Sequence, residues 1–204
     1  MNEPGLYMLS IDLPTPSKQQ VELYLSNWDK LDNYVLQESS LKKLFTKTYP
    51  NNAELDDILI KVCSLNDFYS TNIFSPFTIA KHIQSLGIDK YLASNELSVV
   101  NKISRVKMNG GKHRNFYSFA SKYCSHHKPD TYPIYDSYVD KVLVYFRKRD
   151  KFYDFRYGDL RNYRKFTSII LAFRSFYVLE AFSVKDIDKY LWQLGKEYFP
   201  KKYK

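Results

Sequence analysis

The chain has 204 residues, a net charge of +9, 44% hydrophobic residues and 17% aromatic residues. This apolar content is enough for a packed core and excludes a disordered or collagen-like chain, while charges interrupt every window of the ~20 apolar residues that a membrane helix needs. Met1–Pro4 do not begin a secretory signal, so we expect a cytoplasmic protein, and two cysteines are too few for a disulfide framework or a four-cysteine metal site.

Positive charge is concentrated in the second half of the chain. Residues 1–102 carry 9 Lys and Arg against 12 Asp and Glu, whereas residues 103–204 carry 22 against 10. Such an excess attracts polyanions, so we expect duplex DNA as the partner, contacted at its backbone through the C-terminal half. The alternative is that these cations only keep an aromatic-rich surface soluble. No basic amphipathic helix indicates a membrane partner, and no feature predicts an oligomeric state.

The first half of the chain predicts a series of helices. Pro14–Ser17 provides a stop and a cap, and apolar residues then recur every three or four positions from Val21 to Val35, in a helix that can continue to Phe45 before Tyr49–Pro50 break it. Further helices are expected over residues 53–65, from Pro76 to a Gly87 stop, and in short pieces at 89–92 and 97–103.

The second half opens with the Gly110-Gly111 turn inside the basic stretch 107–115. Helices are then predicted over residues 115–125, 136–149, 163–179 and 184–198, and Ser183 with Asp186 forms a capping box at the start of the last one. No alternating strand pattern is long enough to indicate a sheet. The predicted class is all-α, with a helix in 1–52 packing on the C-terminal lobe, a helical domain over 53–149, and helices in 150–204 completing the second lobe.

Several common catalytic and metal motifs are absent. No lysine has Asp or Glu two positions before it, as a common nuclease motif requires, and the zinc protease, deaminase, phosphate-loop and dinucleotide patterns are also missing. His126-His127 is the one metal-like pair, but adjacent histidines on a helix point apart, so we expect them on a loop surface. No metal and no cofactor are predicted.

The Gly110-Gly111 turn is the first candidate site. A glycine hairpin that opens a helix presents unpaired backbone N–H groups that can hold a phosphate oxygen, while Lys107, Lys112 and Arg114 supply neutralising charge. These five residues are therefore predicted to grip DNA backbone. On the residues alone, an ordinary solvated turn is the alternative.

Asp136 is the second candidate site, because it follows the apolar segment 132–135 at the start of a predicted helix. An Asp in this position is first of all a helix cap. The same position can also place a carboxylate at the mouth of a cleft, where it activates water or stabilises a cationic sugar.

Residues 53–145 resemble the helix-hairpin-helix (HhH-GPD) DNA glycosylase superfamily. Val106–Asn115 is similar to its hairpin, Phe116–Cys124 to the helix that follows, and Tyr132–Val139 to its apolar-Pro-Val-Asp-Thr-His-Val segment, although Lys107–Gly111 lacks the proline and spaced glycines of Leu-Pro-Gly-Val-Gly. The resemblance implies a two-lobed helical bundle in which Asp136 carries the chemistry. Residues 60–66 are similar to the end of a helix that, in this family, places a polar residue into the gap left by a flipped base. The resemblance therefore implies that Asn66 fills this gap.

The implied activity is hydrolysis of the N-glycosidic bond of a flipped, damaged or modified base, as in DNA repair. Lys112 lies near the position of a Schiff-base lysine, but simple base removal is favoured over lyase activity. Two alternatives remain open: a non-catalytic DNA-binding module with the same fold, and a helical protein-interaction module with a tyrosine-rich surface. Salt-dependent DNA binding separates the last from the others, and an Asp136→Asn variant separates the first two.

Overall fold

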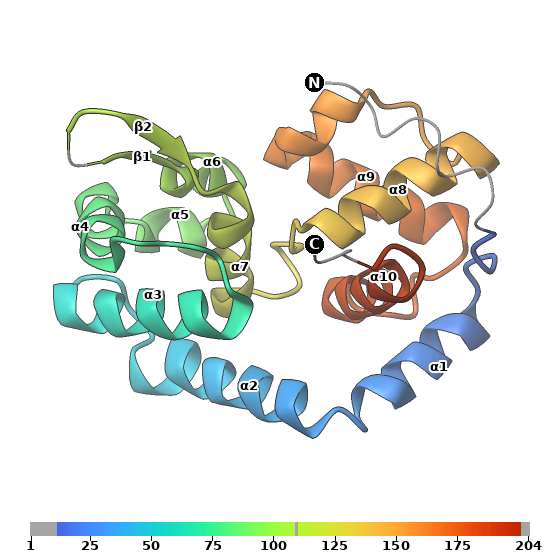
Figure 1. Cartoon of the computed structure of the whole chain (residues 1–204), viewed down its shortest axis with the longest axis horizontal. Helices are drawn as coiled ribbons and strands as arrows, with labels where there is room; N and C mark the ends of the chain where they lie inside the picture. The colour runs from blue at the N-terminus through green and yellow to red at the C-terminus, as the bar shows by residue number, and fades with distance from the viewer. Residues whose placement is uncertain (1–11, 109, 201–204) are drawn as a thin grey trace. The chain divides into compact units, whose positions relative to one another are not determined.

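The computed structural model describes residues 12–108 and 110–200. Met1–Pro4, considered above for a secretory signal, and Asn109 of the predicted hairpin lie outside the described residues. The chain folds into two compact units, which we name the terminal unit (described residues 12–30 and 135–200) and the middle unit (31–134). Helices take up 66% of the described residues, so the predicted mainly helical class is confirmed (Figure 1). No described helix is both long enough and apolar enough to cross a membrane.

The terminal unit joins one helix from the start of the chain to the helices of its end. Its elements are α1 (Lys18–Trp28), α8 (Ser137–Asp150), a 3-10 helix (Tyr157–Arg161), α9 (Tyr163–Phe176) and α10 (Val184–Tyr198). Aromatic rings join α1 to α10, with centroids 5.4 Å apart for Tyr24 and Tyr190 and 5.7 Å apart for Trp28 and Trp192. Edge-to-face ring pairs of this kind add to the apolar burial that drives the packing.

Helices α8 and α10 approach each other closely at Gly195. A Cβ atom at this position would lie 2.6 Å from the Cβ and 2.8 Å from the backbone oxygen of Tyr138. Only glycine therefore fits at this crossing. The contact sets the position of the first turn of α8, where Tyr138 follows Asp136 by two residues.

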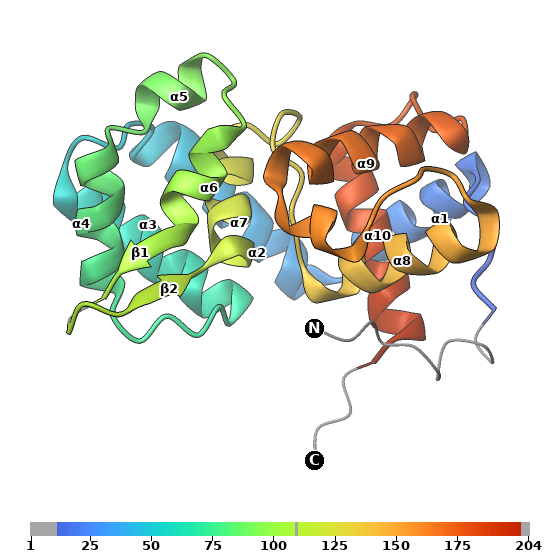
Figure 2. The ribbon, with the colours of Figure 1, turned by 90° about the horizontal axis from the view of Figure 1, so that it is seen from above.

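The middle unit contains the remaining helices and the two strands. Its elements are α2 (Asp32–Lys43) with a π-helical continuation (Leu44–Thr48), α3 (Leu55–Tyr69), α4 (Pro76–Leu86), α5 (Asp89–Ala93), α6 (Ser98–Ser104), β1 (Arg105–Lys107), β2 (His113–Asn115) and α7 (Tyr117–His127). Helix α7 is buried along almost its whole length and packs against α6, α3 and α2. The antiparallel strands β1 and β2 form a hairpin between α6 and α7, with α4 nearby (Figure 2).

A buried polar network centred on Asn52 ties the middle unit together. The Asn52 side-chain oxygen accepts hydrogen bonds from Lys61 Nζ at 2.8 Å and from the Tyr123 hydroxyl at 2.6 Å. Its Nδ2 donates to Asp89 Oδ1 at 2.6 Å and lies 3.2 Å from His127 Nε2. Burial is the main cause that lowers the pKa of His127 to about 3, and the nearby Lys61 charge is the second cause. The ring is therefore neutral, and its Nε2 can accept a hydrogen bond from Asn52.

The divisions between the units differ from the predicted boundaries. The chain leaves the terminal unit after residue 30 and returns at residue 135, rather than dividing at 52 and 149. Helix α2 belongs to the middle unit because its continuation places Phe45 against Tyr123, with ring centroids 5.1 Å apart. Helix α8, and Asp136 with it, belongs to the terminal unit because it packs on Gly195 of α10.

Candidate nucleic-acid interface

The positive charge is shared between the two units, although it is unequal between the two halves of the sequence. The middle unit, residues 31–134, contains 13 Lys and Arg against 9 Asp and Glu, and the rest of the chain contains 18 against 13. The net charges are therefore +4 and +5. The units therefore do not correspond to the halves of the sequence, because each unit takes residues from both halves.

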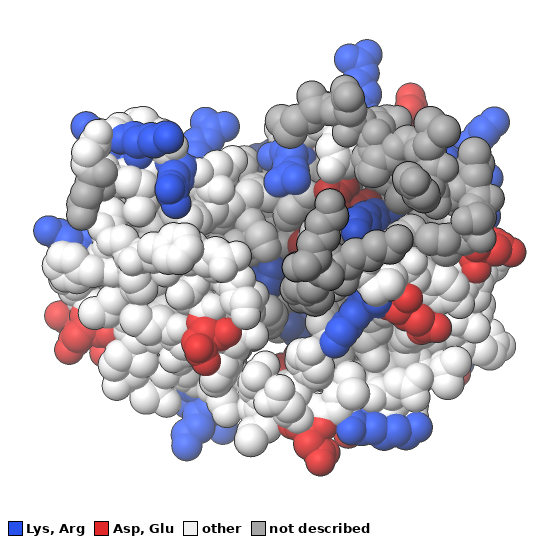
Figure 3. All heavy atoms as spheres, viewed as in Figure 1, with Lys and Arg blue, Asp and Glu red and all other residues white. Residues whose placement is uncertain are grey.

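Within the middle unit, the cations gather along one stretch of sequence. Residues 97–129 contain seven Lys and Arg and no Asp or Glu. The stretch covers α6, the β1–β2 hairpin and α7. The hairpin carries four exposed cations, Arg105, Lys107, Lys112 and Arg114, and Lys102 of α6 is also exposed. Lys and Arg gather over the hairpin at the upper left of Figure 3, and Asp and Glu of the same unit lie lower in that view. We name this surface, defined by the four cations, the hairpin face.

The strands set the side of the hairpin from which each of these side chains projects. Val106 is buried beneath the hairpin, while its neighbours Arg105 and Lys107 are exposed, as the alternation of side chains along a strand requires. Arg114 pairs with Val106 and therefore projects from the same side of the ribbon as that valine, whereas His113 pairs with Lys107 on the other side. All three residues of β2 are nevertheless exposed. The cations of the two strands therefore project from both sides of the ribbon and remain exposed.

The Gly110-Gly111 turn closes this β-hairpin, and the prediction that it opens a helix is wrong. Both glycines have positive φ, 88° and 80°, which is why the turn needs glycine. The Gly111 N–H donates to the Met108 oxygen at 3.0 Å, so this group is not an unpaired phosphate donor. Strand β2 and Phe116 separate the turn from α7. Lys112 is exposed beside the turn, at the tip of the hairpin.

Asn66, which the resemblance predicts to fill the gap left by a flipped base, holds the loop between α3 and α4 through hydrogen bonds. Its Oδ1 accepts hydrogen bonds from the Ile73 N–H at 2.9 Å and the Thr71 hydroxyl at 2.8 Å, and its Nδ2 donates to the Ile73 oxygen at 3.2 Å. The amide thus pairs with both backbone groups of Ile73. A role in the gap of a flipped base would require these bonds to break.

Asp136 is the N-cap of α8. Its Oδ1 accepts from the backbone N–H groups of Tyr138 at 2.7 Å and Val139 at 3.4 Å, the pairing that makes Asp a preferred cap. The side chain is half-buried, and its Oδ2 takes part in no hydrogen bond within the described residues. Asp136 therefore caps a helix and also presents one carboxylate oxygen for other contacts.

Asp140, one turn further along α8, is a buried carboxylate that the sequence did not reveal. Its Oδ2 accepts from the hydroxyls of Tyr135 at 2.7 Å and Tyr157 at 3.1 Å, while its buried Oδ1 has no hydrogen-bond partner in the described part of the chain. Burial raises the pKa of Asp140. The four-residue spacing from Asp136 was the available signal, but an acid in a first helical turn usually faces solvent.

The two adjacent histidines lie at the end of α7, and their expected place on a loop surface is wrong. His126 is buried and its Nε2 lies 3.0 Å from the Tyr69 hydroxyl, while His127 belongs to the Asn52 network. Within residues 12–108 and 110–200, no three His, Cys, Asp or Glu side chains group as metal ligands.

The predicted site residues fall into separate parts of the fold. Lys107, Gly110, Gly111, Lys112 and Arg114 come together on the hairpin. Asn66 lies on α3 of the same unit, and Asp136 lies in the terminal unit. These five hairpin residues are thus the one group of predicted site residues that comes together in the described structure.

Comparison with known proteins gives two matches. Residues 20–131 match the family described as HI_0787_N, N-terminal domain. A Haemophilus influenzae protein described as uncharacterized is 47% identical over 148 residues, which are 72% of this chain and 70% of that protein. No solved structure matches. Because the family match spans more than half of the chain and includes the hairpin, the chain belongs to the HI_0787_N N-terminal domain family.

Proposed function

We propose that this protein binds DNA, and that the hairpin face of the middle unit contacts the phosphate backbone. The observation that carries the proposal is the acid-free stretch 97–129, which presents a row of exposed cations on one short ribbon. Lys and Arg neutralise phosphates and release bound counterions, so such a surface binds backbone without reading sequence. No acidic residue offsets the seven cations of this stretch, whereas the rest of the middle unit contains six Lys and Arg against nine Asp and Glu.

Removing three hairpin cations is expected to weaken DNA binding strongly. In a Lys107→Ala/Lys112→Ala/Arg114→Ala variant, the slope of log affinity against log salt becomes less steep by about 0.9 for each phosphate that the variant no longer neutralises. At ~0.1 M salt, loss of these phosphate contacts is expected to lower the affinity for DNA roughly 100-fold or more. Fluorescence anisotropy with a labelled duplex over a series of salt concentrations measures both quantities.

The matched control removes three exposed cations from α2 and its π-helical continuation in the same unit, in a Lys42→Ala/Lys43→Ala/Lys47→Ala variant. It changes the net charge by the same amount and is expected to lower the affinity far less. Equal weakening in the two variants would mean that net charge, and not the hairpin face, controls binding. Absence of salt-dependent binding by the native protein would favour the protein-interaction alternative.

A second candidate function is hydrolysis of the N-glycosidic bond of a flipped, damaged or modified base. Support comes from the order of elements: a hairpin between two helices, then an Asp at the start of the next helix, with described segments 12–30 and 135–200 in one unit. This order agrees with the resemblance to HhH-GPD glycosylases, although the hairpin here is made of strands. A non-catalytic DNA-binding module remains the alternative.

In this second function, the chemistry is assigned to the Asp136 carboxylate. The enzyme extrudes the target nucleotide from the duplex, because the bond to be broken is unreachable within the base stack. Cleavage places positive charge on the deoxyribose, and Asp136 Oδ2 would stabilise this charge and orient the attacking water. Its Oδ1 meanwhile remains bound to the first turn of α8.

Substitution of Asp136 separates its capping role from this chemistry. Asn is as good an N-cap as Asp, so Asp136→Asn is expected to retain the midpoint of thermal unfolding and the affinity for DNA. Asp136→Ala loses the cap and about 1 kcal/mol of unfolding free energy. If Asp136 is catalytic, both variants lose the formation of alkali-labile sites on duplexes with damaged or modified bases. An Asp136→Asn variant that still forms these sites would refute the hydrolytic role.

A further inference from the structure

We infer that a pocket between α4 and the β1–β2 hairpin binds unpaired nucleotides of a DNA strand, with bases stacked on Phe74 and Phe77 and phosphates held by Lys81 and Lys107. The inference rests on the proposed DNA binding and specifies its substrate as a single strand or the unpaired part of a duplex. It is carried by the pocket lining and by the exposure of the two phenylalanines.

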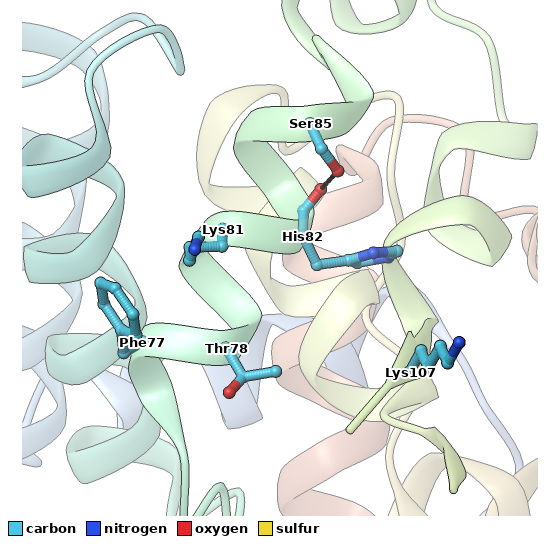
Figure 4. Close-up of a pocket in the computed structure, with 6 residues that line it drawn as sticks. All are labelled: Phe77, Thr78, Lys81, His82, Ser85 and Lys107. Carbon is cyan, nitrogen blue, oxygen red and sulfur yellow. Dashed lines mark hydrogen bonds between the residues drawn. The ribbon is translucent and has the colours of Figure 1, made fainter. Parts of the chain in front are cut away.

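The pocket has a volume of about 360 Å³ and combines cations, hydroxyls and an aromatic ring. Its lining residues are Phe77, Thr78, Lys81, His82, Ser85 and Lys107. Figure 4 shows Phe77 and Lys107 at opposite sides, with Thr78, Lys81 and His82 between them. No acidic side chain lines the pocket, so it is suited to an anionic group and has an aromatic surface at one edge.

The walls of the pocket are fixed by hydrogen bonds that leave both lysines available. A ring nitrogen of His82 lies 3.0 Å from the Lys102 oxygen, which ties α4 to α6 just before β1. The Ser85 hydroxyl donates to the His82 oxygen at 2.7 Å. Lys81 Nζ lies 5.4 Å from the centroid of the Phe77 ring and is otherwise exposed. A phosphate held by Lys81 would therefore lie beside the Phe77 ring, and Lys107 supplies positive charge at the opposite side of the pocket.

Two aromatic rings, those of Phe74 and Phe77, are exposed at the N-terminal end of α4. Phe74 is 86% exposed and Phe77 is 53% exposed, whereas most phenylalanines in proteins are buried. The loop that presents Phe74 is held in place by the bonds of Asn66 to Ile73, the preceding residue. The ring is thus displayed by an anchored backbone, which reduces the entropy lost when a base stacks on it.

The combination of exposed rings and cations favours a single strand over a duplex. Bases within a duplex are already stacked on each other and present only their edges in the grooves. Unpaired bases expose their faces, and proteins that bind single strands combine aromatic stacking with a positively charged groove. The four cations of the hairpin face continue the charge of the pocket, since Lys107 belongs to both.

The test compares the native chain with a Phe74→Ala/Phe77→Ala variant, which leaves the charge unchanged. Binding of a labelled single strand of about 20 nucleotides and of a duplex of equal length is measured by anisotropy at the same salt concentration. Loss of stacking is expected to weaken single-strand binding roughly 10-fold or more and duplex binding less than about 2-fold. A Phe74→Trp/Phe77→Trp variant is expected to keep single-strand binding, because its rings still stack.

Leu36→Ala serves as the control for loss of an exposed apolar side chain, since Leu36 is 67% exposed on α2 of the same unit. It is expected to leave both affinities unchanged. The inference is overturned if the phenylalanine variant binds the single strand as the native chain does, or if it loses single-strand and duplex binding equally. In both cases salt-dependent duplex binding by the native chain would still support the proposed function. The proposed function itself fails only if the native chain shows no salt-dependent DNA binding.

Discussion

Replacing Gly195 with alanine is expected to destabilise the terminal unit by about 2 kcal/mol or more. The added Cβ would lie 2.6 Å from the Tyr138 Cβ and 2.8 to 2.9 Å from two of its backbone atoms. Backbone atoms cannot rotate away as the end of a flexible side chain can, so α8 and α10 must move apart, and overpacking of this kind costs about 1–3 kcal/mol or more. This cost exceeds the ~1 kcal/mol that alanine gains over glycine inside a helix.

Gly158→Ala is the matched control, because it lies in the same unit and a Cβ atom there would meet no atom within 4 Å. Thermal and urea unfolding of the two variants measure the difference. A Gly195→Ala variant as stable as the Gly158→Ala variant would show that the helices tolerate a wider crossing. Since Tyr138 follows Asp136 by two residues, the displacement is also expected to reduce any activity that depends on Asp136.

Replacing Lys61 with methionine is expected to have the largest effect on the middle unit. The ammonium group is fully buried and donates to the Asn51 oxygen at 2.7 Å, the Tyr49 oxygen at 3.0 Å and Asn52 Oδ1. Methionine fills a similar volume but leaves the two backbone carbonyls without this donor, and each such buried group costs about 1–3 kcal/mol. We expect a loss of roughly 3 kcal/mol in the free energy of unfolding.

The stability difference is also expected to depend on pH. Burial lowers the pKa of Lys61 from 10.5 to about 8, so between these values the unfolded chain binds more protons than the folded chain. The free energy of unfolding of the native protein therefore rises with pH through this window, a contribution that the methionine variant lacks.

Urea unfolding at a series of pH values between about 7 and 10.5 is expected to show the gap between the native protein and Lys61→Met widening with pH. Lys47→Met, at an exposed position, is the control and is expected to leave stability nearly unchanged. A constant gap across this range would show that Lys61 does not lose its proton more readily in the folded state.

Local signals in the sequence predicted the helices well. The caps formed by Ser17, Asp136 and the Ser183–Asp186 box are all present, and Gly87 ends α4 with a positive φ of 55°. Each of these depends on residues within a few positions of each other, so the pattern and its physical cause lie in the same short segment.

The two strands of the hairpin were not predicted from the sequence, because no local pattern marks them. The strands have three residues each, and only Val106 is buried between exposed neighbours, so no alternating pattern is visible. The helix predicted from the apolar stripe Val21–Val35, with a continuation allowed to Phe45, is instead two helices, α1 and α2, which belong to different units. Tyr24 packs in the terminal unit and Phe45 in the middle unit, while Leu31 and Val35 between them are partly exposed.

Buried polar groups also depended on distant partners. Lys61, His127 and Asp140 resemble surface residues in the sequence, because nothing within a turn of the helix marks them as internal. Lys61 donates to acceptors at residues 49–52, and His127 pairs with a partner 75 residues away. The pKa values of these three groups change because the groups are buried, and burial is defined only once the chain has folded.

The sequence by itself determined the helical class, the ends of most helices and the residues that make the hairpin basic, because these follow from composition and from interactions between near neighbours. The tertiary structure alone decided which charges share a surface, since the chain enters the middle unit at residue 31 and returns to the terminal unit at residue 135. It also decided that Asp136 caps a helix fixed by Gly195 and that Phe77 lines a cationic pocket while Phe74, three residues earlier, is exposed. These arrangements depend on contacts between residues far apart in the chain, whose distances only the packed fold sets.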